Sequence, residues 1–344
     1  MPVDRSALKA LGALAAAGVL ALAGAEAVLG AFYPQERMSS AYVDRWGTRL
    51  YIGHANIRHR RYHFDVTYHT NALGFRGPDR PFEKPAGTAR IVVLGASFVF
   101  GSGVANGLTY GELLEAKLNA ANLAKRFEVV NLGAPGTPLA FHELLYRDLG
   151  RKYSPDVVVV HAQLNGVTDL NAHQFARQDY PMESGGTGWA GVARTVLRNF
   201  PGYAFLCENS HLWALKRKSM VGRGVTGGNP AAATGPAAAK EGPSPEEFAA
   251  RQRGYLERLD AIASDVCASG GTTVVLRAKD HFAPFPLIDS TLDAWDRARP
   301  CVRSLEVSVT PDLIIAAGDP HWNEKGQEAA ASALAGLLAP RFKR

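Results

Sequence analysis

Cysteine is scarce in this chain of 344 residues, which contains only Cys207, Cys267 and Cys301. Their spacing excludes a disulfide-dense scaffold and the paired cysteines of a zinc site. At most one internal disulfide can form, and Cys267 with Cys301 is a candidate pair. The net charge of +6 comes without a dense basic tract, so no nucleic-acid partner is expected.

Two glycine-rich nucleotide signatures are also missing. The glycines around Ser97 are not followed by Lys and then Ser or Thr, which excludes a phosphate-binding P-loop. They also lack the G-x-G-x-x-G spacing of a dinucleotide fold. Because Val99 stands two residues after Ser97, the G-x-S-x-G elbow of the α/β-hydrolases is absent too. The sequence therefore predicts no cofactor.

The most informative stretch that is present is a short apolar strand followed by a serine. Four apolar residues, Ile91 to Leu94, precede Gly95 and predict a buried strand of an α/β sheet. Open α/β sheets bind ligands at the carboxyl ends of their strands. Glycine allows a tight turn and leaves room for a substrate, so Ser97 in this turn is a candidate nucleophile.

Three later segments carry further candidate site residues at the ends of predicted strands or helices. Gly136 follows a strand that ends near Leu132, Asn165 follows a strand at 157–160, and His321 precedes the last helix. In this order, Ser97, Gly136, Asn165 and His321 make the chain resemble the SGNH (GDSL-type) hydrolases from about residue 70 to the C-terminus. Residues 71–78 are also similar to a lead-in found in membrane-attached bacterial members.

The resemblance implies a role for each of these residues. A serine hydroxyl needs a base to take its proton, and an imidazole titrates near neutrality, so Ser97 is the expected nucleophile and His321 the expected base. Attack on an ester carbonyl creates an oxyanion. The family's donors correspond to the backbone N–H groups of Ser97 and Gly136 and the side-chain amide of Asn165. This chemistry needs no metal.

The sequence departs from the family pattern at three places. The usual Asp before the nucleophile is Ala96, and the block-three Gly and Asp are Gln163 and Gly166. The Asp normally three residues before the final histidine is Gly318, and the nearest substitute is Asp319, only two residues before it. The missing carboxylate normally orients the imidazole. We assign this role to Asp319, although the one-residue shift changes the expected direction of its side chain.

The N-terminus contains a long apolar run. After Arg5 and Lys9, residues 10–25 carry no charge, and the apolar stretch continues past Glu26 to Phe32. A membrane span needs about 20 residues. Small residues at 23–25 or 25–27 also suit a signal-peptide cleavage site, but the length favours an uncleaved anchor. Either interpretation places the rest of the chain outside the cytoplasm, with Arg5 and Lys9 inside.

The remaining sequence predicts an α/β fold in which a central, mostly parallel sheet lies between two layers of helices, as in flavodoxin-like proteins. We divide the chain into an anchor or signal segment at 1–34, a β-rich lead-in at 35–88 and a hydrolase domain at 89–340. An insertion and flexible linker interrupt the domain at about 170–243. The lead-in contains four histidines that we interpret as scattered surface residues rather than metal ligands: His54, His59, His63 and His69.

The insertion contains apolar clusters, including Phe205, Leu206, Trp213 and Leu215. Such clusters suit core packing, a lid over the site, or contact with the membrane.

Together these features predict an extracytoplasmic, membrane-anchored serine esterase that acts through an acyl-Ser97 intermediate. O-acetyl groups on an envelope polysaccharide are the first substrate class to test. An O-acyltransferase that uses the same Ser and His is one alternative. A degenerate domain that binds glycan or scaffolds an envelope complex is another. The oligomeric state cannot be predicted from the sequence.

Overall fold

The computed structural model describes residues 5–38, 42–46, 48–162, 201–222, 244–279 and 286–343. The chain forms two compact units. The first unit comprises Met1–Ser40, Arg58–Asp65 and Gly186–Ala233. The second comprises Ala41–Ile57, Val66–Gly185 and Thr234–Arg344.

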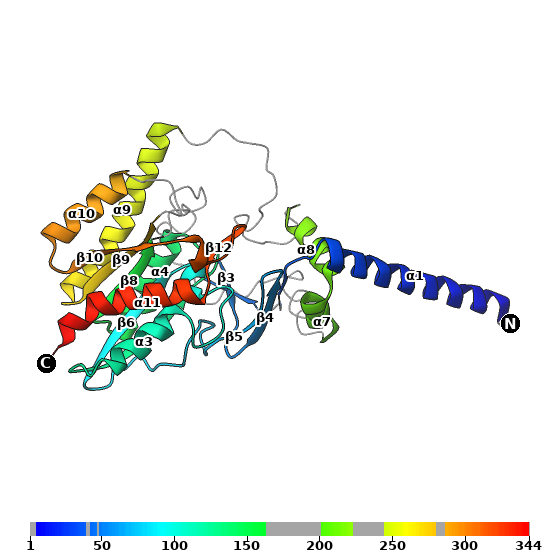
Figure 1. Ribbon diagram of the computed structural model, residues 1–344, viewed down its shortest axis with the longest axis horizontal. Helices are drawn as coiled ribbons and strands as arrows, with labels where there is room; N and C mark the ends of the chain where they lie inside the picture. The colour runs from blue at the N-terminus through cyan, green and yellow to red at the C-terminus, as the bar shows by residue number, and fades with distance from the viewer. Residues whose placement is uncertain are drawn as a thin grey trace. The chain divides into compact units, whose positions relative to one another are not determined.

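A parallel five-stranded sheet forms the centre of the second unit (Figure 1). Its strands are β6 (Thr88–Gly95), β7 (Arg126–Gly133), β8 (Val157–Ala162), β9 (Thr272–Lys279) and β10 (Val302–Ser308). They lie in the order β10-β9-β8-β6-β7, so β6 pairs with both β7 and β8. The strand order reverses at β6, and ligands of open α/β sheets bind at the carboxyl ends of strands at such a point.

Helices cover both faces of this sheet. α3 (Tyr110–Ala120) and α11 (Glu324–Leu338) pack on one face, and α4 (Leu139–Asp148), α9 (Pro245–Ala268) and α10 (Pro286–Ala298) pack on the other. Along β6, Ile91 and Val93 point to the first face while Val92 and Leu94 point to the second, as the two-residue period of a strand requires. The predicted three-layer fold is confirmed.

Capping boxes fix the starts of two of these helices. Thr109 and Glu112 cap α3, and Ser244 and Glu247 cap α9. Pro245 occupies the first turn of α9, where a missing N–H costs nothing.

Several short elements complete the second unit. They are α2 (Ser97–Phe100), the hairpin β2 (Tyr42–Arg45) and β3 (Thr48–Tyr51), the hairpin β11 (Ile314–Ala316) and β12 (Asp319–Trp322), and 3-10 turns at Gly150–Tyr153, Pro311–Leu313 and Ala339–Phe342.

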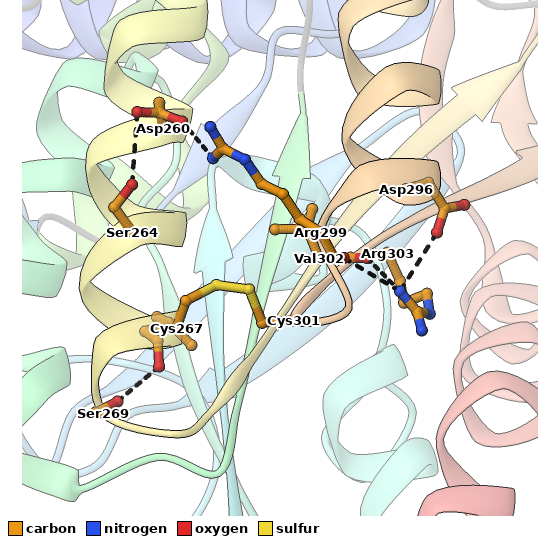
Figure 2. Close-up of a disulfide and its surroundings, with 10 residues drawn as sticks. Asp260, Ser264, Cys267, Ser269, Asp296, Arg299, Cys301, Val302 and Arg303 are labelled. Carbon is orange, nitrogen blue, oxygen red and sulfur yellow. Dashed lines mark hydrogen bonds and ion pairs between the residues drawn. A yellow bond between two sulfur atoms is a disulfide. The ribbon is translucent and has the colours of Figure 1, made fainter.

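A disulfide joins Cys267 at the end of α9 to Cys301 just before β10, with the two Cα atoms 5.6 Å apart (Figure 2). The same two segments are also linked by an ion pair, in which Arg299 Nη1 lies 2.5 Å from Asp260 Oδ1. The candidate pair from the sequence is thus the bonded pair, and Cys207 is a buried free thiol.

The first unit contains the apolar N-terminal helix, α1 (Arg5–Phe32), with β1 (Arg37–Met38), α7 (Pro201–Asn209) and α8 (His211–Gly222). Strand β1 pairs with β4 (Asn56–Arg61), which continues the three-stranded sheet to β5 (Phe64–His69). Residues 6–32 of α1 have a mean hydropathy of 1.8 and are long enough to cross a membrane. The helix is a candidate anchor or signal sequence.

One histidine of the lead-in differs from the expectation of scattered surface residues. The His59 ring is buried, and its Nε2 lies 2.6 Å from Glu36 Oε1. Arg61 donates to the other oxygen of the same carboxylate. Among the described residues, no three His, Cys, Asp or Glu side chains converge as a metal site.

Candidate functional site

Ser97 begins α2 directly beyond β6, at the edge of the sheet where the strand order reverses. Ala96 stands at the N-cap and supplies no side-chain hydrogen bond to the helix. The first N–H groups of a helix have no partner within the helix. Among the described residues, the Ser97 N–H has no acceptor, so it is available to a substrate oxygen at this edge.

The carbonyl end of α2 is held by a buried arginine from the segment at 71–78. The Arg76 guanidinium donates to the carbonyl oxygens of Phe100, Gly101, Val104 and Ala105 at 2.9 to 3.4 Å. Burial lowers the pKa of Arg76 from its usual value, and the four carbonyl dipoles stabilise its charge. This contact fixes the turn that carries Ser97.

A second side chain ties α2 to the neighbouring strand. The Asn131 amide donates to the Val99 carbonyl oxygen at 2.7 Å, and its own oxygen accepts from Gly133 N–H at 2.8 Å. Glycine is required at position 133, because a Cβ there would lie 2.3 Å from the Phe100 nitrogen. The turn that carries Ser97 therefore packs directly against β7.

The structure brings Ser97, His321 and Asp319 together. The Ser97 Oγ lies 2.8 Å from His321 Nε2, and His321 Nδ1 lies 2.5 Å from Asp319 Oδ1. The Asp319 side chain is only 6% exposed, whereas that of His321 is 24% exposed. A carboxylate accepts a hydrogen bond from the Nδ1–H of a neutral imidazole, which leaves the lone pair of Nε2 toward the serine hydroxyl. This is the hydrogen-bonded order of a nucleophile, a base and an orienting acid.

The strand conformation of β12 explains how Asp319 reaches the ring from two residues away. Side chains at i and i+2 of a strand share a face, so Asp319 and His321 point to the same side. The His321 N–H also donates to Asp319 Oδ1 at 3.2 Å. Gly318, by contrast, lies in the turn between β11 and β12, outside the strand. In this chain the usual three-residue spacing is therefore unnecessary.

Two polar residues of the last helix fix β12 relative to α2. Asn323 caps α11 through the N–H groups of Lys325 and Gly326. One turn later, the fully buried Gln327 donates to the Phe98 carbonyl oxygen at 3.3 Å and accepts from Tyr110 N–H at 2.8 Å. Gln327 thus links the helix after His321 to the helix that begins at Ser97.

A second histidine lies beneath the site. The ring centroid of His161 is 4.9 Å from that of Trp322 and 5.5 Å from that of Phe98. Burial lowers the pKa of His161 to about 3, so this ring is neutral at neutral pH. His321 is instead partly exposed and hydrogen-bonded to Ser97, as a general base for this serine would have to be.

Gly136 lies in the turn after β7, at the same sheet edge as Ser97. Its φ of +73° is left-handed, which glycine adopts without steric cost. The turn is braced because Thr137 donates its hydroxyl to the Ala134 carbonyl oxygen at 2.6 Å and lies 3.0 Å from His142 Nε2. Burial lowers the pKa of His142 to about 3, so its neutral ring donates from Nε2 to the threonine.

The third predicted oxyanion donor, Asn165, lies outside the described residues, as do Gln163 and Gly166. Of the predicted site residues, the structure therefore places Ser97, His321, Asp319 and Gly136.

Sequence reasoning missed the supporting residues Arg76, Asn131 and Gln327. Each is a polar side chain whose partners are backbone groups distant in sequence, and no spacing rule predicts such contacts. For Gln327 alone the sequence contained a signal: a polar residue at a position that shares a helix face with the apolar residues of α11.

Comparison with known proteins gives results for structure but not for sequence. No family model matches the chain, and no curated protein matches it.

Solved structures that resemble this chain are GDSL-family hydrolases and esterases. A lipolytic protein of the G-D-S-L family from Desulfitobacterium hafniense is 9% identical, covers 73% of this chain and 99% of its own, and has a TM-score of 0.39. A lipase/acylhydrolase from Enterococcus faecalis is 13% identical and has a TM-score of 0.42; the match covers 74% of this chain and 97% of the other. A family 3 carbohydrate esterase from Clostridium thermocellum is 12% identical, with 74% and 97% covered and a TM-score of 0.41. The functional argument rests on the side chains of this chain itself.

Proposed function

We propose that this protein is an SGNH-type serine esterase that hydrolyses carboxylic esters through an acyl-Ser97 intermediate. One observation carries the proposal: the continuous hydrogen-bonded line from Ser97 Oγ through the His321 ring to Asp319. A structural serine has no need of a histidine oriented by a buried carboxylate.

In the first half of the reaction, Ser97 Oγ attacks the ester carbonyl carbon while its proton moves to His321 Nε2. Asp319 stabilises the imidazolium that forms. The carbonyl oxygen becomes an oxyanion, for which Ser97 N–H is one donor and Gly136 N–H and the Asn165 amide are the others we propose. The intermediate then collapses: the alkoxide leaves with the proton from His321, and the acyl group stays on Ser97.

In the second half, a water molecule replaces the alcohol. His321 takes a proton from the water as its oxygen attacks the acyl carbon, and the same proton returns to Ser97 Oγ when the carboxylic acid departs. The neutral, buried His161 does not compete for these protons. The oxyanion donors are each worth roughly 3 to 4 kcal/mol in the transition state.

The departures at Ala96, Gly166 and Gly318 are the ground for the alternative of a degenerate domain that only binds glycan or scaffolds a complex, and Gly166 lies outside the described residues. The geometry favours catalysis, because Asp319 takes the orienting position and Ala96 removes none of the reacting groups. No contact among the described residues favours an O-acyltransferase over hydrolysis.

The proposed location is outside the cytoplasm, with α1 as an uncleaved anchor. Two features support it. The first is the length and hydropathy of α1, with Arg5 and Lys9 at its start. The second is the disulfide between Cys267 and Cys301, since such bonds persist in oxidising compartments (Figure 2). From this location, we propose O-acetyl groups of an envelope polysaccharide as the substrate class.

The test is hydrolysis of p-nitrophenyl acetate by the full-length protein in detergent, beside Ser97→Ala and His321→Ala. Both variants should lose the activity while their circular dichroism remains that of the wild type. Ser102→Ala is the matched control, because this serine lies in the same turn. Hydrolysis that persists in Ser97→Ala would contradict the proposal.

A further inference from the structure

A carboxylate of the apolar N-terminal helix caps another helix of the first unit. Glu26 of α1 accepts hydrogen bonds from Ser210 Oγ at 2.8 Å and Leu212 N–H at 3.1 Å, and from His211 N–H. The first N–H groups of α8 have no partner within the helix. Glu26 binds two of them from a distant segment, beside Ser210, whose Oγ accepts from Trp213 N–H at 3.0 Å.

A second contact fastens the same two helices. The Gln35 N–H donates to His211 Nδ1 at 2.9 Å, and the His211 ring packs against Gly30, where a Cβ would lie 3.3 Å from it. The C-terminal end of α1 is therefore an integral part of the folded unit. Cleavage after residue 27 would remove the Glu26 cap, and cleavage after residue 25 would turn it into a chain terminus.

If α1 spans a bilayer, its length determines how deep Glu26 and the first turn of α8 lie in the membrane. Residues 6–25 correspond to about 30 Å of helix at 1.5 Å per residue, which matches the hydrocarbon thickness of a bilayer. Lys9 lies close enough to the start for its long side chain to reach the headgroups. Glu26, and with it the first turn of α8, then lies where the hydrocarbon ends.

The hairpin of α7 and α8 has an internal core and an apolar outer surface. Tyr203 and Trp213 pack edge to face with ring centroids 5.8 Å apart, and Cys207 is buried. Three large apolar side chains are nevertheless exposed: Phe205 at 65%, Leu206 at 39% and Leu215 at 42%. In Figure 1, α7 and α8 lie beside the C-terminal end of α1 within the first unit.

Basic residues flank the exposed leucine. At about 100° per residue, Lys218 lies about 60° to one side of Leu215 and Lys216 about 100° to the other. Both lysines are exposed, and α8 contains no acidic residue. Among the described residues, neither lysine pairs with a carboxylate. An exposed apolar side chain between two lysines suits a helix that lies in a membrane interface.

We propose that α7 and α8 dock on the surface of the membrane that α1 spans, with Phe205 and Leu215 in the interface and Lys216 and Lys218 on the phosphates of anionic phospholipids. Continuity with α1 and charge complementarity select this partner. The proposal rests on the membrane-anchoring part of the proposed function, and it is independent of the esterase chemistry.

The experiment uses the full chain in vesicles of phosphatidylcholine, with or without about one third phosphatidylglycerol. An environment-sensitive fluorophore is attached through Leu215→Cys in a Cys207→Ala background. We expect spin-labelled lipid to quench the fluorophore, and aqueous iodide to have little effect, in the anionic vesicles. Replacing Lys216 and Lys218 by Gln should reduce the lipid quenching about twofold or more. A fluorophore at Phe205→Cys repeats the test on the other helix.

The control fluorophore replaces Tyr62, which is 82% exposed in the same unit. It should be quenched by iodide in every vesicle. Quenching at position 215 by iodide but not by lipid would overturn the docking proposal, and so would protection from both quenchers, which would mean cover by protein. Carbonate extraction separates these results from a failed anchor: protein that leaves the vesicles in carbonate contradicts the membrane span itself.

Discussion

The two buried histidines near the site should make the protein sensitive to mild acid. Burial lowers the pKa of His142 and of His161 from the ordinary 6.5 to about 3. Below pH 6.5 the unfolded chain binds protons at these positions that the folded chain does not. The free energy of unfolding is therefore unaffected by these two histidines above pH 6.5, and it falls as the pH drops toward 3.

The size of this effect follows from the two pKa values. Lowering the pH from about 7.5 to about 5 should cost about 2 kcal/mol for each histidine, or about 4 kcal/mol together. His161→Phe should recover about half of this loss, because phenylalanine keeps the packing on Trp322 and Phe98 and has no proton to bind.

The assay is urea unfolding at several pH values for the wild type, His161→Phe and the exposed control His63→Gln. The stability of His161→Phe should depend less steeply on pH, whereas the control should follow the wild type. The reasoning is refuted if His161→Phe loses as much stability between pH 7.5 and pH 5 as the wild type does.

Three further predictions concern the site and its supports. Asp319→Asn should lower kcat for p-nitrophenyl acetate about 10³- to 10⁴-fold, because an amide does not stabilise the His321 imidazolium; a kcat equal to that of the wild type would contradict the orienting role of Asp319. Gln327→Leu should cost about 2 to 4 kcal/mol in urea unfolding, because Tyr110 N–H and the Phe98 carbonyl lose buried partners; an unchanged midpoint would count against this link. Cys301→Ser should cost about 4 kcal/mol for a bridge spanning 34 residues, measured by thermal unfolding against Cys207→Ser; equal melting temperatures with and without reductant in the wild type would show that no bridge forms.

The fold could be predicted from the sequence because its signals are local. The apolar run before Gly95 marked β6, and the Ser, Pro and Glu at 244–247 marked the start of α9. The strand order then follows from how a parallel sheet is wound, and it places the chemistry at the edge where the order reverses.

The precise positions of side chains could be predicted only in part. From the sequence alone, the shift from three residues to two left the direction of the Asp319 side chain toward His321 unexplained. The strand conformation of β12 explains it, because residues two apart in a strand share a face. Arg76 and Gln327 were missed because they bind backbone groups that the fold brings near them.

The contact of Glu26 with α8 was missed for a similar reason. In the sequence, Glu26 is only a charge tolerated near the end of an apolar run, and its partners lie 184 to 186 residues away. No local pattern links the two segments.

The most direct test of the central claim is covalent labelling of the full-length protein by a fluorophosphonate, followed by peptide mapping. The account predicts one modified residue, Ser97, and loss of labelling in His321→Ala, because the hydroxyl then has no base. Labelling of another serine, or none in a folded wild type that also fails to hydrolyse p-nitrophenyl acetate, would contradict the assignment of Ser97 as the nucleophile.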